Sequence, residues 1–301
     1  MRQLLISLLC YGCLLLLNPK AFAQSCIPTG FNGMVYDYVC PQSCSTLVKQ
    51  IPHIKGTEDY TVSTIPHTPY PWVSGTGTEL IELYADDMYS AVVPLPFPFC
   101  FYGSVYNNCV VGSNGLISFD ISIANQVNSW SLTTVPHGST PQPVPYAGGV
   151  PNDVTSTYYP RASIMGAYHD IYPLLNPGGQ RRVEYTTVGT APCRKFVISF
   201  YLVPLYGSAV CNARYCSQQI VLHENTGLID VHLGDKPVCN GWNMGLAILG
   251  VQNWNRNAAV TAPGKNATVW SETASSYRFT PSGNGSRFVR SEMYTLGGTL
   301  V

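Results

Sequence analysis

Four aspartates have side chains suited to metal binding or acid–base chemistry: Asp86, Asp87, Asp153 and Asp170. Paired carboxylates can cleave glycosidic bonds, and Ca²⁺ takes about six to eight oxygen ligands of this kind. Asp86 and Asp87 are adjacent, so on a strand they point to opposite faces and share one site only in a turn. We favour the simpler interpretation that each carboxylate accepts backbone N–H bonds in a loop. The sequence therefore predicts no cofactor, with a calcium site at these aspartates as the alternative.

The sequence lacks the motifs of the common hydrolases and phosphate-binding proteins. The stretch Gly112-Ser113-Asn114-Gly115 does not match the G-x-S-x-G elbow of serine hydrolases. It is typical of a tight turn, in which Asn and Gly accept positive φ. The six histidines include no H-E-x-x-H motif, and no G-x-x-x-x-G-K-[ST] loop occurs. We therefore expect a protein that is not an enzyme.

Aromatic side chains offer another kind of binding chemistry, because their faces stack on sugar rings. The chain has 20 tyrosines and 5 tryptophans, and Trp242, Trp254 and Trp270 are the candidates for a glycan-stacking platform. The simpler interpretation is that these scattered tryptophans pack in the core or at its rim. A carbohydrate-binding module or a carbohydrate-active enzyme is thus the alternative to a module that binds another surface protein.

Composition narrows the class of protein further. Only 11% of the residues are charged, 46% are hydrophobic, and Lys+Arg and Asp+Glu are both 16. Such a chain can bury a large core, and it has no excess of positive charge to attract a nucleic acid. Gly and Pro contribute 27 and 23 residues, which favours short elements joined by turns over long helices.

The first 23 residues have the form of a secretory signal peptide. Met1-Arg2-Gln3 precedes an apolar run from Leu4 to Leu17, and Ala21-Phe22-Ala23 provides the small residues of a cleavage site. The apolar run is shorter than the roughly 20 residues that span a bilayer, so we expect no transmembrane anchor. The sequence predicts a secreted, extracellular protein, associated with a cell surface.

Export makes disulfide bonds the expected state of the cysteines. Two of the 11 cysteines lie within the signal peptide, so nine remain, and an odd number cannot all pair within one chain. The short-range candidates are Cys100 with Cys109, which flank a predicted hairpin, and Cys211 with Cys216. A zinc site is not indicated, because no paired C-x-x-C set with a nearby histidine occurs.

Short apolar segments between turn residues recur from about residue 90 onward. In Phe196 to Leu205, apolar and polar residues alternate with the period of a half-buried strand. Gln219 to His223 and Leu228 to Leu233 are joined by Glu224-Asn225-Thr226-Gly227, which predicts a β-hairpin. We expect an all-β, antiparallel β-sandwich. It should have few helices and long Pro/Gly-rich loops over 132–160 and 171–180.

Four passages resemble the nidogen-like extracellular domains, in the same order along the chain. They are Leu95 to Gly103 with its "PFxFYG" pattern, Val111 to Phe119 with "SNGxISF", Met165 to Ile171, and Gln219 to Asp230. The chain is similar to the N-terminal module of large exported surface proteins of gliding Bacteroidetes-type bacteria. These proteins typically carry PKD-like or Ig-like repeats and a gliding-motility-associated sorting domain read by the type IX secretion system. The resemblance implies that the sandwich is nidogen-like or jelly-roll-like. It also implies a non-enzymatic interaction or adhesion module whose partner is a surface protein or a polysaccharide.

Three segments are predicted after the signal peptide. Residues 24–80, with repeated Pro and three cysteines, form an irregular N-terminal extension that lies on the sandwich of 81–281. Residues 282–301 begin a following Ig-like or PKD-like domain or form a poorly packed tail. Because Gly297-Gly298 is a hairpin signal that leaves too few residues for a returning strand, we expect the polypeptide to continue beyond Val301.

Overall fold

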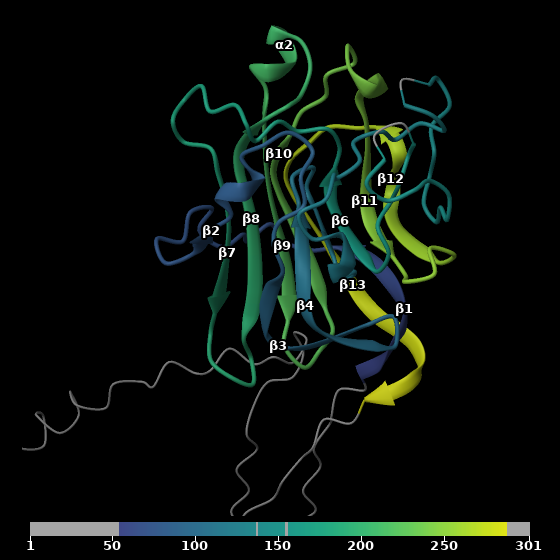
Figure 1. Ribbon diagram of the computed structural model, residues 1–301. Coiled ribbons are helices and arrows are strands. Elements are labelled where there is room, and N and C mark those ends of the chain that lie inside the picture. Colours follow the sequence, from purple (N-terminus) through teal and green to yellow (C-terminus); the bar gives the residue numbers. More distant parts are fainter. Residues whose placement is uncertain (1–53, 137, 154–155, 288–301) are drawn as a thin grey trace, which may run out of the picture.

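The computed structural model describes residues 54–136, 138–153 and 156–287. Two antiparallel sheets stack face to face in a β-sandwich (Figure 1), which confirms the predicted fold class. The predicted signal peptide, residues 1–23, and the segment 24–53 lie outside the described residues. No helix of the described part is long and apolar enough to cross a membrane.

The larger sheet has seven strands in the order β1-β13-β10-β9-β8-β7-β2. Their bounds are β1 Ile54–Thr64, β13 Glu272–Arg287, β10 Ile229–Lys236, β9 Tyr215–His223, β8 Lys195–Pro204, β7 Arg182–Val188 and β2 Thr78–Glu79. The β9–β10 hairpin forms as predicted, with Leu222 opposite Ile229 and positive φ at Asn225 and Gly227 in the turn.

The smaller sheet has six strands in the order β12-β11-β6-β5-β4-β3. Their bounds are β12 Ala259–Val269, β11 Leu246–Gln252, β6 Ser163–Tyr168, β5 Leu116–Ser118, β4 Ser104–Gly112 and β3 Val93–Phe101. Helices are few and short among the described residues: α2 Ala209–Asn212 and the 3-10 turns η1 Ile81–Leu83, η2 Ile121–Ile123 and η3 Asn243–Gly245.

The main core lies between the sheets, and a second buried cluster lies outside the smaller sheet. Phe200 and Ile220 of the larger sheet meet Phe101 and Leu249 of the smaller one in the main core. In the second cluster, Tyr159 and other residues of the 120–160 loops pack against strands of the smaller sheet. These strands are therefore buried on both faces, which explains why few of them show strict apolar–polar alternation.

The predicted boundary at residue 81 is wrong at its N-terminal side, because β1 belongs to the sandwich itself. β1 pairs with β13 along the sheet edge, and Tyr60 buries its ring against Phe101. The polar composition of an edge strand, exposed on one side, hides its period in the sequence.

The irregular residues 65–77 lie across the outer face of the larger sheet, where Gln219 Nε2 donates to the Tyr70 carbonyl at 3.1 Å.

The C-terminal boundary also differs from the prediction. Residues 282–287 continue β13, and Arg287 pairs with Ile54 of β1, so this stretch extends the sandwich rather than opening another domain. The remainder of the predicted following segment, 288–301, lies outside the described residues.

Candidate functional site

Three of the four predicted aspartates lie together at one end of the sandwich. Asp86 and Asp87 lie in the bend that follows η1, and Asp170 lies just after β6. One carboxylate oxygen from each residue lies within 4.8 Å of those of the other two. Asp153 lies in another loop and is not part of this group, which we call the acidic cluster.

A left-handed turn allows two adjacent aspartates to share this site. Asp87 has φ 51°, in the region that L-residues seldom adopt and that Asp tolerates better than most. Side chains of neighbouring residues diverge on an extended strand, but this turn brings both carboxylates to the same side. The three carboxylates therefore lie together, and the donors to Asp87 and Asp170 are the side chains of Asn114 and Trp242 where the sequence suggested backbone N–H groups.

Asn114 joins the loops that carry the cluster. Its Nδ2 donates to Asp87 Oδ1 at 2.8 Å, and its Oδ1 accepts from the Ile171 N–H at 3.1 Å. Its own N–H donates to Asn128 Oδ1 at 3.0 Å, and the side chain is fully buried. The Ser113-Asn114-Gly115 turn forms as predicted, with φ 88° at Gly115. The sequence indicated the turn but not that its buried amide positions Asp87 and Asp170.

The acidic cluster is desolvated on one side and open on the other. Asp170 is buried, whereas Asp86 is exposed and Asp87 is half-buried. Burial, with the charge of Asp87 as the next cause, holds the pKa of Asp170 well above its ordinary value, although the Trp242 N–H opposes the shift. Burial raises the pKa of Asp87 to about 7, against the hydrogen bond from Asn114 and helped by the charge of Asp86. Burial also raises the pKa of Asp86.

No basic side chain neutralises this charge within the described ranges. The ion pairs there involve Asp230 and four glutamates, and none reaches Asp86, Asp87 or Asp170. Asp170 Oδ2 accepts the indole N–H of Trp242 at 2.6 Å, but its Oδ1 is buried with no hydrogen-bond partner among the described residues. Such an arrangement can bind a cation or share protons, because three close carboxylates cannot all remain charged without cost.

Four half-buried aromatic side chains lie next to the acidic cluster. Trp130 contacts Trp242 with ring centroids 5.6 Å apart, Trp242 contacts Tyr206 at 4.8 Å, and Tyr206 contacts Tyr172 at 4.9 Å. We call these four residues the aromatic run. A small pocket beside them is lined by Asp170, Tyr206 and Trp242 together with His169 and others.

Only Trp242 of the three predicted stacking tryptophans belongs to this run. Trp270 is buried in the main core, where the ammonium groups of Lys236 and Lys265 lie over its ring. Trp254 lies on the surface beneath the Arg161 guanidinium. The predicted platform of all three is therefore wrong. The loop aromatics that do join Trp242 carry no signal in the sequence, because their contacts depend on loops distant along the chain.

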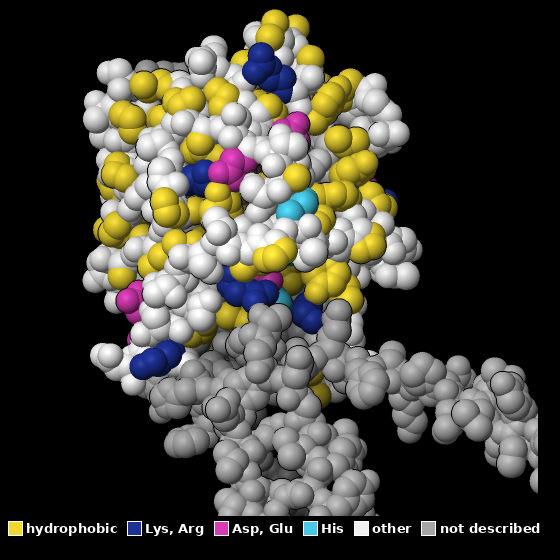
Figure 2. All heavy atoms as spheres, turned by 180° about the vertical axis from the view of Figure 1, so that it is seen from behind, with side chains coloured by type: hydrophobic (Ala, Val, Ile, Leu, Met, Phe, Trp, Pro, Cys, Tyr) yellow, Lys and Arg dark blue, Asp and Glu magenta, His cyan; other side chains and the backbone are white. Residues whose placement is uncertain are grey.

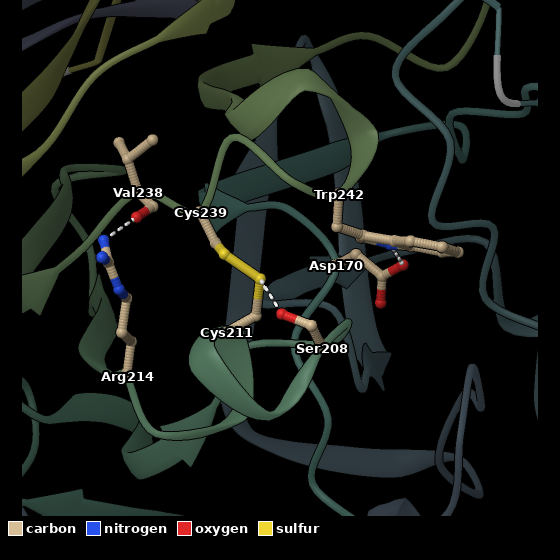
Figure 3. The surroundings of a disulfide bond; sticks show 7 residues. All are labelled: Asp170, Ser208, Cys211, Arg214, Val238, Cys239 and Trp242. Carbon is tan, nitrogen blue, oxygen red and sulfur yellow. Dashed lines mark hydrogen bonds between the residues drawn. A yellow bond between two sulfur atoms is a disulfide. The ribbon is translucent and has the colours of Figure 1, made fainter.

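A disulfide fixes the loops behind the aromatic run. Cys211 of α2 is bonded to Cys239, which follows β10, with their Cα atoms 5.5 Å apart (Figure 3). The predicted pair of Cys211 with Cys216 is wrong, because Cys216 lies within β9 opposite Val203 and is a buried thiol. The β9–β10 hairpin instead brings Cys239, which follows β10, back beside Cys211 in α2. In Figure 3 the bonded pair of Asp170 and Trp242 lies beside this disulfide.

The predicted bridge between Cys100 and Cys109 is also wrong. These residues do not face one another across the β3–β4 hairpin, since Cys100 lies opposite Val105 and Cys109 opposite Val93. Cys109 is a buried thiol, and burial raises its pKa to about 12. Cys193 is in a disulfide, as expected for an exported chain.

Comparison with known families identifies the fold. A family model described as NIDO related matches residues 59–288. The chain belongs to the NIDO-related family. The match supports the expected nidogen-like module, and the matched range of the NIDO-related domain includes most of β1, all of β13 and the whole acidic cluster. Neither the curated proteins nor the solved structures compared with the chain gave a significant match.

Proposed function

We propose that this NIDO-related domain is a non-enzymatic interaction or adhesion module of an exported protein, and that it binds its partner through the aromatic run. The observation that carries the proposal is the continuous contact of four half-buried aromatic rings at one end of the sandwich. Aromatic residues are enriched in the cores of protein interfaces, where they bury much surface with little loss of rotamer freedom.

The surroundings of the aromatic run support a binding role. The same loops expose apolar side chains at Leu174, Val210 and Met244. The Cys211–Cys239 bond and the ring contacts hold these loops in place before a partner arrives, which lowers the entropy cost of binding. On the face opposite to the view of Figure 1, charged side chains are few and of both signs (Figure 2).

Polar groups that resemble catalytic residues have structural partners. Ser113 Oγ accepts the Met88 N–H at 3.0 Å, and His223 Nε2 lies 2.8 Å from Asp230 Oδ2. The NIDO-related family is not known as an enzyme family. These facts support a non-enzymatic role. The sequence resemblance to surface proteins of gliding Bacteroidetes-type bacteria further supports export by type IX secretion and a place at the cell surface.

Carbohydrate is the second candidate for the partner. Trp130 and Trp242 lie beside the carboxylates of the acidic cluster, and sugar-binding sites combine aromatic faces with such acceptors. A polysaccharide would then replace a surface protein as the partner, through the same loops.

A glycan array and a panel of extracellular proteins, each probed with the purified chain, test these alternatives. Tyr206→Ala should weaken binding at least about tenfold, the scale of a central aromatic contact. Trp254→Ala is the matched control, because this exposed aromatic residue lies outside the run, and it should bind like the wild type. Equal binding by both variants would refute the proposed surface. Hydrolysis of an arrayed glycan, abolished by Asp170→Asn, would refute the non-enzymatic role.

A further inference from the structure

We propose that Asp86, Asp87 and Asp170 bind a divalent cation of the calcium type. The inference does not depend on the proposed function, since it concerns the acidic cluster and not the partner of the aromatic run. It starts from the geometry: one carboxylate oxygen from each residue lies within 4.8 Å of the others, close enough for all three to reach one ion.

A buried, unpartnered oxygen provides the independent observation. Asp170 is 6% exposed, and its Oδ1 has no hydrogen-bond partner within the described part of the chain. Its Oδ2 is held by Trp242, so the carboxylate cannot rotate freely to find another donor. A buried acceptor of this kind costs about 1–3 kcal/mol unless a ligand satisfies it. A cation bound between the three aspartates would supply the missing partner.

The surrounding hydrogen bonds hold the three carboxylates in place. Asn114 bonds both the Asp87 carboxylate and the backbone at Ile171, one residue beyond Asp170. The Asn128 N–H donates to the Asp87 carbonyl at 2.9 Å, which fixes the left-handed turn. Exposed Asp86 leaves the cluster open to solvent on one side, so that an ion can enter with part of its water shell. The carboxylates are thus held close together although no Lys or Arg of the described residues pairs with them.

The donor set favours calcium over zinc or magnesium. All three donors are hard carboxylate oxygens, and the nearby His169 is not part of the group. Zinc prefers nitrogen and sulfur ligands. Magnesium keeps several waters and usually takes only one or two carboxylates, whereas calcium tolerates irregular oxygen shells.

The competing explanation is that the aspartates share protons and bind no ion. Both explanations relieve the same repulsion, so substitution alone does not separate them. In the proton-sharing case Asn at any of the three positions stabilises the chain, and added calcium changes nothing. In the cation case the same substitution also abolishes a calcium-dependent gain in stability.

Thermal unfolding of the purified full chain, first treated with a chelator and then supplied with about 1 mM Ca²⁺, tests the site. The wild type should gain about 2–4 °C, since a site with an affinity in the range of extracellular modules stabilises by mass action. Asp86→Asn should lose this gain while keeping its fold, because Asp86 is exposed. Asp153→Asn, the matched control outside the cluster, should keep the gain.

Terbium luminescence gives a second readout that does not depend on stability. Tb³⁺ has oxygen preferences like those of Ca²⁺, and Trp242, bonded to Asp170, should sensitise its emission. Ca²⁺ should displace the ion, and Asp86→Asn should weaken the affinity for Tb³⁺ at least about tenfold, since even partners that only orient metal ligands affect affinity by about 10–100-fold. The proposal is overturned if neither Ca²⁺ nor Tb³⁺ has an effect, if Asp86→Asn responds like Asp153→Asn, or if Mg²⁺ stabilises more than Ca²⁺. A wild-type response that Asp86→Asn loses and Asp153→Asn keeps supports it.

Discussion

Asp170 and Asp230 are both buried, at 6% and 3% exposure, yet their surroundings treat a negative charge in opposite ways. Burial alone would raise the pKa of Asp230, but hydrogen bonds from Arg278 and His223 outweigh it and leave the pKa well below its ordinary value. The Arg278 nitrogens lie 2.6 and 2.7 Å from the two carboxylate oxygens. Among the described residues, the Asp170 carboxylate accepts only the Trp242 N–H, and the neighbouring charges that raise its pKa are those of Asp87 and Asp86.

The two aspartates differ in whether the fold provides a counter-charge for the buried carboxylate. The cross-strand position of Asp230, opposite Arg278 in the β10–β13 ladder, makes its network part of the sheet. Asp170 lies in a loop after β6, in a group of three acids that the described part of the chain leaves without a counter-charge. We therefore interpret the role of Asp230 as structural. For Asp170 the contrast supports the proposed role as a ligand of a cation.

The largest expected effect comes from removing the disulfide behind the aromatic run. The double substitution Cys211→Ser and Cys239→Ser should lower the free energy of unfolding by about 3–4 kcal/mol, since the bond closes a loop with a sequence separation of 28. Urea unfolding under oxidising conditions measures the loss. A double variant as stable as the wild type would show that these loops are held by other contacts, and that the rigid positioning of Trp242 has another cause.

The next largest effect is expected at Asp230, the buried carboxylate that is paired with Arg278 and His223. Asp230→Asn should lower the free energy of unfolding by about 2–3 kcal/mol, less than for a fully buried pair because the Arg278 side chain is 25% exposed. Chemical denaturation at neutral pH measures it, with the exposed Glu82→Gln as the control of equal charge change. A loss of less than about 0.5 kcal/mol would mean that Arg278 and His223 do not stabilise Asp230.

The pH dependence of the acidic cluster has a predictable sign. The pKa of Asp87 is raised to about 7, so its contribution to stability is fully present below about pH 4 and is lost as pH rises through 7. His169 and His232, whose pKa values burial lowers to about 3 and about 4, act in the opposite direction below about pH 6.5. The difference between wild type and Asp87→Asn isolates the aspartate.

In a chelator, the wild type should lose stability relative to Asp87→Asn between pH 4 and pH 7, by at most about 1.4 kcal/mol per pH unit. Urea midpoints collected across this range provide the measurement. A constant difference would show that Asp87 titrates as an ordinary surface carboxyl. Asp230, with its lowered pKa, contributes instead above about pH 4 and loses its contribution in stronger acid.

The smallest effect concerns the hydrogen bond that the Asp170 side chain accepts from Trp242. Trp242→Phe keeps an aromatic ring against Tyr206 but removes the indole N–H, and should cost about 1 kcal/mol of stability. Thermal and urea unfolding should agree on this value. Trp130→Phe is the matched control, since it removes the other tryptophan of the run and leaves the hydrogen bond to Asp170 intact. A larger loss of stability in Trp130→Phe would show that Trp130 contributes more to holding the loops than the Trp242–Asp170 hydrogen bond.

The sequence predicted the fold because its signals are local. The β9–β10 hairpin shows two apolar runs around a Gly-ending turn, and Ser113-Asn114-Gly115 carries its own turn chemistry. β1 escaped prediction because it is an edge strand of mostly polar residues whose partner, β13, lies about two hundred residues away. A pairing between strands so far apart is not visible in the local pattern of apolar and polar residues.

The candidate site could be predicted only as a set of residue types. Asp86, Asp87 and Asp170 were recognisable as possible oxygen ligands, but their meeting depends on the left-handed turn at Asp87 and on the buried Asn114. The pairing of Cys211 with Cys239 follows from the intervening hairpin, which returns the chain to α2, whereas proximity along the chain pointed to Cys216. The acidic cluster and the disulfide both depend on tertiary structure, which the spacing of residues along the chain does not reveal.

The contrast between Asp170 and Asp230 is tested most directly by the unfolding free energies of Asp170→Asn and Asp230→Asn, measured side by side at neutral pH in a chelator. Asp170→Asn should raise the free energy of unfolding by about 1–2 kcal/mol, the scale of removing an unsatisfied buried charge, while Asp230→Asn lowers it. A loss in Asp170→Asn as large as that in Asp230→Asn would contradict the account, because the fold would then satisfy both charges.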